Sequence, residues 1–312
     1  MQVRDDLGIT TKLENGKAYL EFALPETIGC LQSALQIEIW ENAESGHLIF
    51  HGEYAPEEAD SMTALLLRPH LWDGMRDPYV YLVKAYGTEV YWQQELAIYD
   101  VRVVDRKGIF LNEKEFLPRE VAYRLPPQIS DTGTREEQMR RDLERLARMG
   151  VNVIRLEGTG SGADGWDSLS VRAFYRLCRS RGFLIGDLWI RPENLPVYRG
   201  LPGETTCEAL LAADGRTLME RYYYYQAKWS SEPVLYPVLS TLHRQENGQV
   251  SLTIYSNQKK VVLYVDGVLF LFQSAQFGDP EFIFEDIPVA KLPLHLAAEA
   301  GNLSISLTVT KI

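Results

Sequence analysis

The sequence predicts a multidomain α+β protein in which two β-rich regions flank a region of alternating strands and helices. Residues 1–105 and 231–312 contain short segments in which apolar and polar residues alternate, as in half-buried strands. Residues 106–230 instead combine apolar residues at intervals of three and four with short, continuously apolar runs. Strands that alternate with helices form parallel sheets covered on both faces. We therefore expect three domains with these spans.

The N-terminal region is expected to be an immunoglobulin-like β-sandwich. About seven short strands in roughly 100 residues are typical of this fold, and turn sequences such as ENGK and YGTE separate them. The chain lacks the Cys–Trp–Cys pattern of antibody domains. The expected strands are 17–24, 34–40, 47–54, 62–69, 79–86 and 89–104, the last of them long enough for two strands.

The central region opens with a predicted helix in TREEQMRRDLERLARMG. Thr134 and Glu137 form a capping-box pattern, and Gly150 is a typical helix end. One apolar face is predicted to be buried, and it consists of Met139, Leu143, Leu146 and Met149. The elements expected next are the strand VNVIRL, a helix over about 168–181 that buries Phe174 and Leu177 and ends at Gly182, the strand FLIGDLWI and a helix over about 215–229.

The C-terminal region is expected to be a second β-sandwich. Asp266-Gly267 lies between two apolar runs and predicts a two-residue hairpin turn. The expected strands lie in PVLYPVLSTL, QVSLTIYSN, KVVLYVDGVLFLF, EFIFEDI and LSISLTVTKI.

Charge and composition exclude several classes of function. The net charge of −11 and the pI near 5.1 argue against nucleic-acid and anionic-membrane partners, which would be repelled. The three cysteines, Cys30, Cys178 and Cys207, are far apart and form no CxxC pair, so we expect a reducing cytoplasm and no disulfide framework. The five histidines show no metal-ligand spacing. We expect no metal and no cofactor.

Four stretches, in chain order, carry family motifs. They are HLWDGMRDPYVYLVKA (70–85), GIFLNEKEFLPREVAYRL (108–125), DLERLARMGVNVIRLEG (142–158), and YYYYQAKWSSEPVLYP with VSLTIYSNQKKVVLYVDG (222–237 and 250–267). They resemble motifs of glycoside hydrolase family 2, the β-galactosidase and β-glucuronidase group. The resemblance implies a partial (β/α) barrel between the two sandwiches. It also places Arg119, Asn152, Arg155 and Asp187 at positions that match the family's motifs.

The departures from the family suggest a shortened protein that does not catalyse by itself. Glu120 replaces a glycine of the family, and Leu188 replaces the glutamate of its "DE" pair. A complete barrel takes about 250 residues, and residues 106–230 supply roughly half of that length. The resemblance implies that both catalytic glutamates belong to strands for which no sequence remains. We therefore expect a pseudoenzyme that acts in carbohydrate binding or assembly.

A substitute active site is the alternative. Glu157 and Asp187 end two expected parallel strands, and a retaining glycosidase needs two carboxyl groups about 5–5.5 Å apart. The chain would then be an active, β-galactosidase-like retaining glycosidase that uses this pair or shares a site with another chain. In the structural interpretation, Glu157 caps a loop or pairs with Arg155 or Arg191, and Asp187 supports the fold.

Carbohydrate binding has its own candidate residues. Aromatic rings offer flat apolar surfaces to sugar C–H groups, and Trp166, Trp189 and Tyr198 are expected in or near loops on the same face. Arg155 and Glu193 are polar candidates for substrate binding at that face. Such aromatic residues also belong to cores and interfaces. Of the four residues Tyr222–Tyr225, two are expected to pack on the sheet, because consecutive helical positions point all round.

The short parallel sheet also bears on assembly. A sheet of about four strands leaves an unpaired edge and an uncovered apolar face. The loop 191–213 is one candidate to cover it. Two half-barrels joined about a two-fold axis are the other, and we predict a homodimer through the middle domain.

Overall fold

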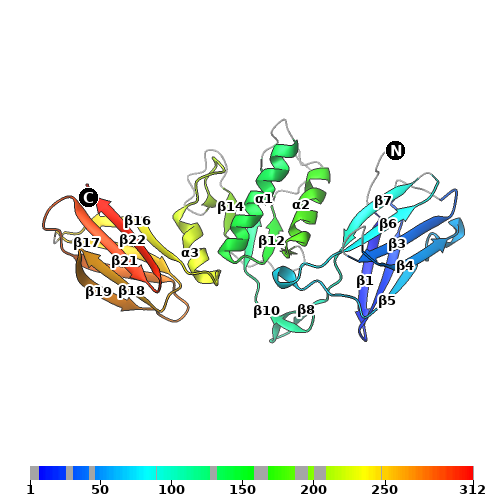
Figure 1. The fold of residues 1–312 in the computed structure, drawn as a ribbon, viewed down its shortest axis with the longest axis horizontal. Coiled ribbons are helices and arrows are strands. Elements are labelled where there is room, and N and C mark those ends of the chain that lie inside the picture. The colour runs from blue at the N-terminus through cyan, green and yellow to red at the C-terminus, as the bar shows by residue number, and fades with distance from the viewer. Residues whose placement is uncertain are drawn as a thin grey trace. The chain divides into compact units, whose positions relative to one another are not determined.

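The computed structural model describes residues 7–25, 31–41, 46–88, 90–126, 132–157, 168–186, 196–199, 209–246 and 248–311. Over these residues the chain is mostly β-strand, with three α-helices (Figure 1). It divides into two compact units, Met1–Pro118 with Asp167–Leu184 and Arg119–Trp166 with Ile185–Ile312. The mainly β composition and the parallel central strands are confirmed. The domain boundaries near 105 and 230 stay predictions.

The first unit contains two antiparallel sheets, ordered β1-β2-β5 and β4-β3-β6-β7. Their inward residues form one core, because alternate positions of β2 and β3 are buried while their neighbours are exposed or half-buried. A small sheet, β10-β9-β8, and helix α2 complete the unit. The elements are β1 Gly8–Glu14, β2 Lys17–Ala23, β3 Leu35–Glu41, β4 Leu48–Tyr54, β5 Thr63–Leu67, β6 Tyr81–Tyr86, β7 Tyr91–Leu96, β8 Val101–Val104, β9 Gly108–Leu111, β10 Lys114–Phe116 and α2 Ser168–Ser180, with short 3-10 helices at Pro56–Glu58 and Gly74–Arg76.

Most strands expected in this region are present, and the long segment 89–104 contains two strands, β7 and β8. Strand β1 was missed, since its sequence GITTKLE has only two apolar side chains, Ile9 and Leu13, and resembles a polar tail. The second helix ends as expected, with Gly182 at a φ of +83°. Its predicted core residues Phe174 and Leu177 are buried.

The second unit begins with a five-stranded sheet, ordered β13-β12-β11-β14-β15. Strand β11 pairs in parallel with both β12 and β14, and β14 pairs in parallel with β15. The four residues predicted to form the buried face of α1 are all buried in the structure. The elements are β11 Glu120–Tyr123, α1 Thr132–Met149, β12 Val153–Leu156, β13 Leu184–Ile185, β14 Val197–Arg199, β15 Ala209–Leu211 and α3 Glu220–Trp229.

Three elements of this unit meet at the backbone carbonyl of Trp229, the last residue of α3. Gly150 follows α1 at a φ of +90°, and a Cβ there would lie 2.5 Å from the Trp229 carbonyl oxygen. Arg119, just before β11, donates a hydrogen bond from Nη1 to the same oxygen. Glycine is therefore required at position 150 for two reasons. One is its positive φ, and the other is the short distance to the Trp229 carbonyl.

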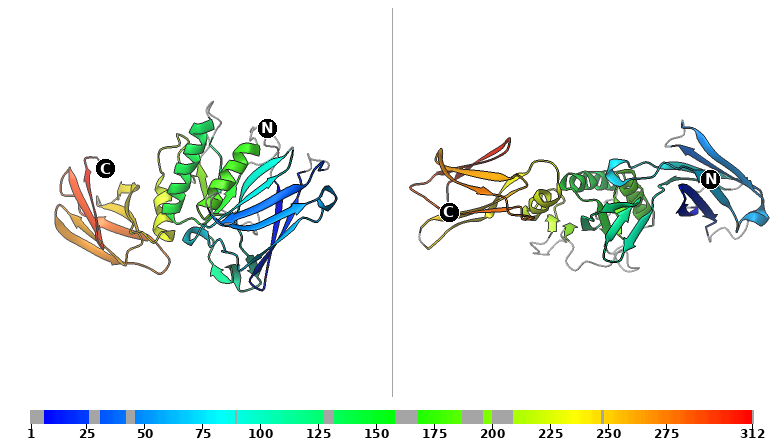
Figure 2. Two further views of the ribbon diagram at one scale, coloured as in Figure 1. Left: turned by 45° about the vertical axis from the view of Figure 1, so that its right-hand side comes forward. Right: turned by 90° about the horizontal axis from the view of Figure 1, so that it is seen from below.

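The C-terminal strands form a β-sandwich of two antiparallel sheets, ordered β16-β17-β20 and β19-β18-β21-β22, which appear as separate layers in Figure 2. The predicted hairpin is confirmed, with Asp266 and Gly267 at φ values of +47° and +79°. Strand β21 was missed, because LHLAAEA contains three alanines and reads weakly as a strand. The strands are β16 Leu235–Arg244, β17 Val250–Ser256, β18 Lys260–Val265, β19 Val268–Ser274, β20 Glu281–Ile287, β21 Leu294–Ala300 and β22 Leu303–Val309.

The tyrosine run of α3 packs against its own unit. Tyr222 is buried. Tyr223 stacks on Tyr236 of β16 with ring centroids 3.7 Å apart, and Tyr224 meets Tyr255 of β17 edge-on at 5.5 Å. These contacts attach α3 to the C-terminal sandwich. Among the described residues, no helix combines the length and apolar character that crossing a bilayer requires.

Candidate functional site

The parallel sheet of the second unit has two faces with different chemistry. Residues along a strand point alternately to opposite faces. Tyr123 of β11 and Tyr198 of β14 both reach Asp142 of α1, so their face is the one that α1 covers. Glu120 and Ala122 of β11 therefore point to the opposite face, and Arg155 lies beside Ala122 in the β11–β12 register.

On the face covered by α1, the Asp142 carboxylate is fully buried. It accepts hydrogen bonds from the Tyr123 hydroxyl at 2.9 Å, the Tyr198 hydroxyl at 3.0 Å and Arg199 Nη2 at 2.8 Å. Gln138, one turn earlier on α1, donates a fourth from Nε2 at 2.9 Å. A buried charge is tolerated when it is paired and hydrogen-bonded, and Asp142 meets both conditions.

The two tyrosine hydroxyls of this network are held in the protonated form. Burial raises the pKa of Tyr123 well above its usual value, and the neighbouring Asp142 carboxylate raises it further. Burial and Asp142 also raise the pKa of Tyr198. The two rings stack with centroids 5.6 Å apart. The network therefore links α1 to the sheet and offers no proton that leaves at neutral pH.

On the opposite face, Glu120 and Arg155 form an ion pair. Arg155 Nε lies 2.7 Å from Glu120 Oε1, with side-chain exposures of 17% and 6%. A Cβ at Gly186 would lie 2.5 Å from the same Glu120 oxygen. Glycine at 186 therefore leaves the room that the Glu120 side chain occupies. Arg155 Nη2 is buried and has no hydrogen-bond partner among the described residues.

Glu157 lies at the carboxyl edge of the sheet, directly after β12. Its backbone N–H donates to the Tyr123 carbonyl at 2.9 Å, which extends the parallel pairing by one residue. Its carboxylate is 3.1 Å from Nε of Arg124, with exposures of 36% and 26% for the two side chains. Glu157 and Arg124 therefore form a partly exposed ion pair at this edge.

The remaining predicted site residues have different outcomes. Asp187, Trp166, Trp189 and Glu193 lie outside the described residues, and the pairing of Glu157 with Asp187 stays a prediction. The expected partners of Glu157 were Arg155 or Arg191, whereas the structure pairs it with Arg124. Tyr198 was expected at a loop, but it is fully buried in β14. The reason is that its hydroxyl binds Asp142 in the interior.

Two family-matching residues lie at the start of the strands, away from the carboxyl edge. The Arg119 backbone N–H donates to Asn152 Oδ1 at 2.7 Å, and the Asn152 N–H donates to the Arg119 carbonyl at 3.1 Å. Burial lowers the pKa of Arg119. These contacts hold β11 and β12 in register, so the structure gives both residues an architectural role.

Sequence reasoning missed the central residue of the buried network, Asp142. It belongs to a charged helix segment, RRDLERLAR, in which nothing separates it from exposed neighbours except its helical phase with Met139 and Leu146. That phase was the available signal. Within the described ranges, no three His, Cys, Asp or Glu side chains are arranged to hold a metal ion.

Comparisons with known proteins identify the fold. Neither a protein-family model nor a curated protein matches the chain. Among solved structures, an FMN-binding beta-glucuronidase from Facaelibacterium prausnitzii L2-6 has a TM-score of 0.69 at 14% identity, covering 98% of this chain and 73% of that one. A putative beta-galactosidase from Bacteroides fragilis has a TM-score of 0.62 at 14% identity, covering 97% and 72%.

A glycosyl hydrolase family 2 member from Bacteroides cellulosilyticus DSM 14838 gives a TM-score of 0.65 at 12% identity, covering 97% of this chain and 63% of that one. The predicted resemblance to glycoside hydrolase family 2 is thus confirmed at the level of the fold. The chain spans between 63% and 73% of the length of these three proteins. At such identities the likeness establishes the fold alone.

Proposed function

We propose that this chain is a carbohydrate-binding protein built on the fold of family 2 glycoside hydrolases and that it does not hydrolyse glycosides by itself. The similar solved structures include proteins described as a beta-glucuronidase and a putative beta-galactosidase, which favours a sugar as the ligand class.

One observation carries the non-catalytic part of the proposal: three acids at the described part of the parallel sheet each have an arginine partner. Glu120 pairs with Arg155, and Glu157 pairs with Arg124. Asp142 pairs with Arg199 and is fully buried. A retaining glycosidase needs two carboxyl groups that both face the sugar. In our proposal these three acids instead serve the fold, because each is engaged by an arginine of the same unit.

The middle region supports the proposal through its size. We propose that residues 106–230 form part of a (β/α) barrel, with the sandwiches 1–105 and 231–312 as immunoglobulin-like domains on either side. A partial barrel lacks the opposite wall that would surround a sugar ring and exclude water. Limited proteolysis checks the boundaries, with first cleavages near residues 105 and 230 as the expected result.

An active retaining glycosidase is the second candidate, favoured by the glycosidases among the similar structures. In this case Glu157 and Asp187 would act as a substitute pair, or another chain would complete the site. We expect such a protein to lose turnover when either acid is replaced by its amide.

The experiment measures hydrolysis of aryl β-galactosides and β-glucuronides by the wild type, Glu157→Gln and Asp187→Asn. The matched control is Glu137→Gln, which alters an exposed acid on α1. Turnover in the wild type that disappears in either site variant, but not in the control, contradicts the non-catalytic proposal.

Binding is tested separately by adding galactose, glucuronate and their oligosaccharides and recording the thermal unfolding midpoint. Stabilisation without turnover supports the proposal. No stabilisation by any of these sugars contradicts its carbohydrate-binding part and favours a role in assembly. Replacement of Trp166, Trp189, Arg155 or Glu193 by alanine then shows whether these candidates contribute to sugar binding.

A further inference from the structure

Strand β19 is an edge of the four-stranded sheet in the C-terminal sandwich (Figure 1). Its sequence, VLFLFQS, contains no charged residue and no proline. It pairs with β18 on one side, and among the described strands none pairs with its other side. The Gln273 side chain of β19 donates a hydrogen bond to the Ile283 carbonyl of β20, but without a paired strand on that side the backbone groups of β19 can accept another strand.

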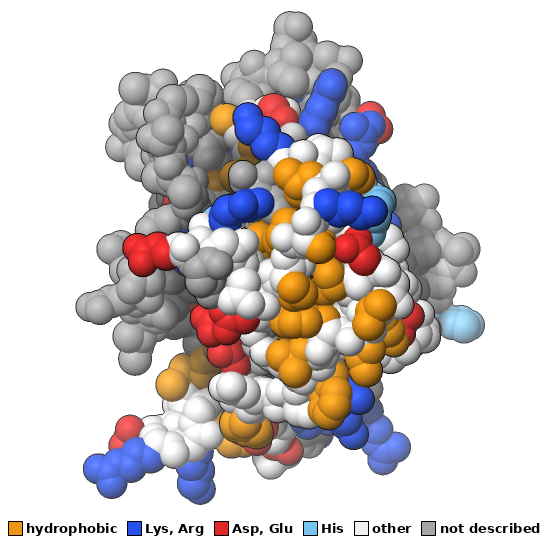
Figure 3. All heavy atoms as spheres, turned by 90° about the vertical axis from the view of Figure 1, so that its left-hand side faces the viewer, with side chains coloured by type: hydrophobic (Ala, Val, Ile, Leu, Met, Phe, Trp, Pro, Cys, Tyr) orange, Lys and Arg blue, Asp and Glu red, His pale blue; other side chains and the backbone are white. Residues whose placement is uncertain are grey.

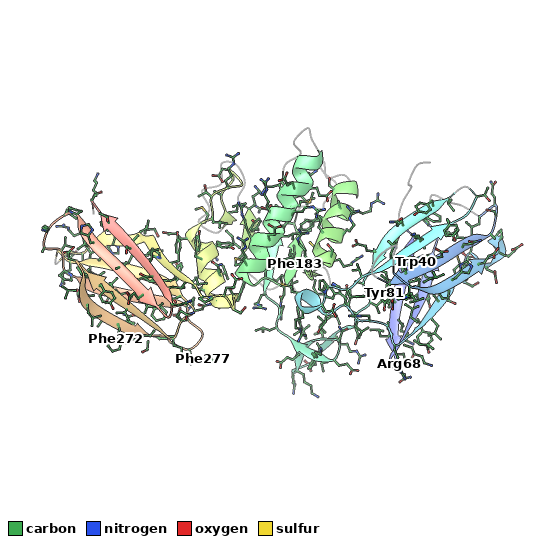
Figure 4. The ribbon with its side chains drawn as sticks, viewed as in Figure 1. Trp40, Arg68, Tyr81, Phe183, Phe272 and Phe277 are labelled. Atoms are coloured by element: carbon green, nitrogen blue, oxygen red, sulfur yellow. The ribbon has the colours of Figure 1, made fainter. Side chains whose placement is uncertain are left out.

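The side chains of this edge are also exposed and apolar. Val268 is 70% exposed, Leu269 56%, Leu271 43% and Phe272 54%, and Phe277 in the following loop is fully exposed. Hydrophobic side chains gather on this side of the C-terminal sandwich (Figure 3). Figure 4 shows Phe272 and Phe277 along the same rim.

The apolar edge is as large as the largest patch of an ordinary monomer, and backbone pairing would add to the area that a partner covers. A phenylalanine side chain presents about 150–250 Å², so the five exposed residues together offer on the order of 500 Å². The largest apolar patch of an ordinary monomer is about 300–600 Å² and is often functional. A standard interface buries about 800 Å² per partner, which this patch approaches before any backbone pairing is counted.

The other edge of the same sheet is different. Strand β22 presents Ser304, Ser306 and Thr308 to solvent, and these alternate with half-buried apolar residues. This is the usual way in which an edge avoids unwanted pairing. Strand β19 has one register irregularity against β18, and its exposed residues are apolar except for Ser274 at its end. The contrast between two edges of one sheet indicates that β19 is kept apolar for a partner.

We propose that two copies of this chain associate through β19, edge to edge and antiparallel about a two-fold axis. Such a contact is self-complementary and closed, so it yields a dimer and no filament. It joins two four-stranded sheets into one of eight strands and covers both apolar edges. The proposal concerns assembly and does not depend on sugar binding.

The charges near β19 favour a second copy as the occupant. Asp266 lies in the turn before the strand, and Lys260 lies opposite Ser274 at its other end, with its Nζ 3.9 Å from the Phe272 ring centre. Antiparallel pairing brings the partner's Asp266 to the end that carries Lys260. The net charge of −11 opposes association at a distance, but no like charges meet within the strand itself.

The parallel sheet, whose expected open edge led us to predict a dimer through the middle domain, is better covered at β15 than the C-terminal sheet is at β19. Residues 209–211 of β15 are all buried. Leu211 forms an antiparallel bridge with Leu218, and α3 packs beside the strand. Strand β19 therefore offers the more exposed edge among the described residues.

The test is the molar mass of the whole chain, measured by light scattering and sedimentation over a range of micromolar concentrations. The variants Leu269→Lys and Phe272→Lys place like charges at the two-fold contact, and each appears twice. We expect each variant to raise the dimer dissociation constant roughly a hundredfold. The matched control, Ser306→Lys, changes the opposite edge of the same sheet and should leave the constant unchanged.

Four outcomes overturn the proposal: a monomeric wild type, a dimer that persists in both β19 variants, a dimer that the control also disrupts, and a mass that keeps growing with concentration. Far-ultraviolet circular dichroism separates loss of the contact from loss of the fold, and it should be the same for all variants. Hydrogen exchange gives an independent measurement. Amides of β19 should become more protected as the concentration increases, while those of β22 should not.

Discussion

The two faces of the parallel sheet hold their buried charges in different ways. On the α1 side, Asp142 is surrounded by four donors and has no exposed surface. On the other side, the Glu120 carboxylate has a single donor among the described residues, Arg155, and a glycine as its neighbour. Each side also keeps one buried arginine nitrogen without a partner among those residues, Arg199 Nε on the α1 side and Arg155 Nη2 on the other.

The two faces therefore differ in the number of donors that surround the buried carboxylate. Asp142 accepts four hydrogen bonds from four residues, and a buried network of this kind makes one arrangement of helix and sheet much more favourable than others. Glu120 accepts one from Arg155. The α1 face is therefore where substitutions should cost most stability.

The largest effect is expected from Asp142→Ala. The change leaves Arg199 and two tyrosine hydroxyls buried without their acceptor, and breaking a buried ion pair costs about 3–5 kcal/mol. Urea denaturation of the whole chain measures the loss. The control Glu137→Gln alters an ion pair on the same helix with exposures of 60% and 59%, and should cost at most about 0.5 kcal/mol. Equal losses in the two variants would contradict the contrast.

The second effect is a loss of stability in alkali. The pKa values of Tyr123 and Tyr198 are raised in the folded chain, whereas unfolded tyrosine ionises near pH 10. Above about pH 10 the folded state therefore binds more protons, and stability falls as the pH rises. Each such tyrosine contributes a slope of up to about 1.4 kcal/mol per pH unit. Urea midpoints between pH 8 and 11 give the slope.

The control for this pH dependence is Tyr123→Phe, which is less stable at pH 8 because the Asp142 carboxylate loses one donor. This variant also lacks one of the two tyrosine hydroxyls of the Asp142 network, while the other tyrosines with raised pKa values are unchanged. Its stability should therefore fall less steeply above pH 10 than that of the wild type. Parallel pH profiles would show that the network does not titrate as described.

Gly186→Ala should have a smaller effect on the opposite face. The new Cβ would lie 2.5 Å from Glu120 Oε1 and 3.4 Å from Val153 Cγ1, so the ion pair must shift. Overpacking of this kind costs about 1–3 kcal/mol. In a Glu120→Ala background the same change should be nearly neutral, which gives a coupling energy of at least about 1 kcal/mol. Additive losses would mean that the two residues do not compete for space.

The smallest effect is expected from Glu157→Gln. Its ion pair with Arg124 is partly exposed, and such pairs contribute about 0.2–1 kcal/mol. Added salt should reduce the difference in unfolding free energy between this variant and the wild type, because exposed charges are screened. A loss above about 2 kcal/mol, insensitive to salt, would place Glu157 in a buried network like that of Asp142.

The sequence predicted elements wherever one local rule dominated. The α1 face follows from apolar spacing, and the turn at Asp266-Gly267 follows from the need for two positive φ values. It failed where the local pattern was weak, in β1 and β21. It also failed at Tyr198, because the polar tip of a tyrosine is compatible with a loop as well as with a buried hydrogen bond.

The site was less predictable than the fold for a physical reason. Glu157 was placed correctly at the end of a strand, since strand order and direction determine that position. Its partner depends on which of several nearby arginines has the right length and direction, and periodicity does not encode this. The dependence of Glu120 on Gly186 is also tertiary, since the two residues lie 66 positions apart in the sequence.

The carbonyl of Trp229 joins the first strand of the parallel sheet, its longest helix and the helix that enters the C-terminal sandwich. The outgoing polypeptide is consequently anchored at one oxygen atom before the sandwich begins. The residues that follow this anchor are held in turn by Asn257 of the sandwich, which bonds the backbone of Ser230, Glu232 and Val234. A larger residue at position 150 would push three secondary-structure elements apart at once, so evolution should tolerate no side chain at Gly150.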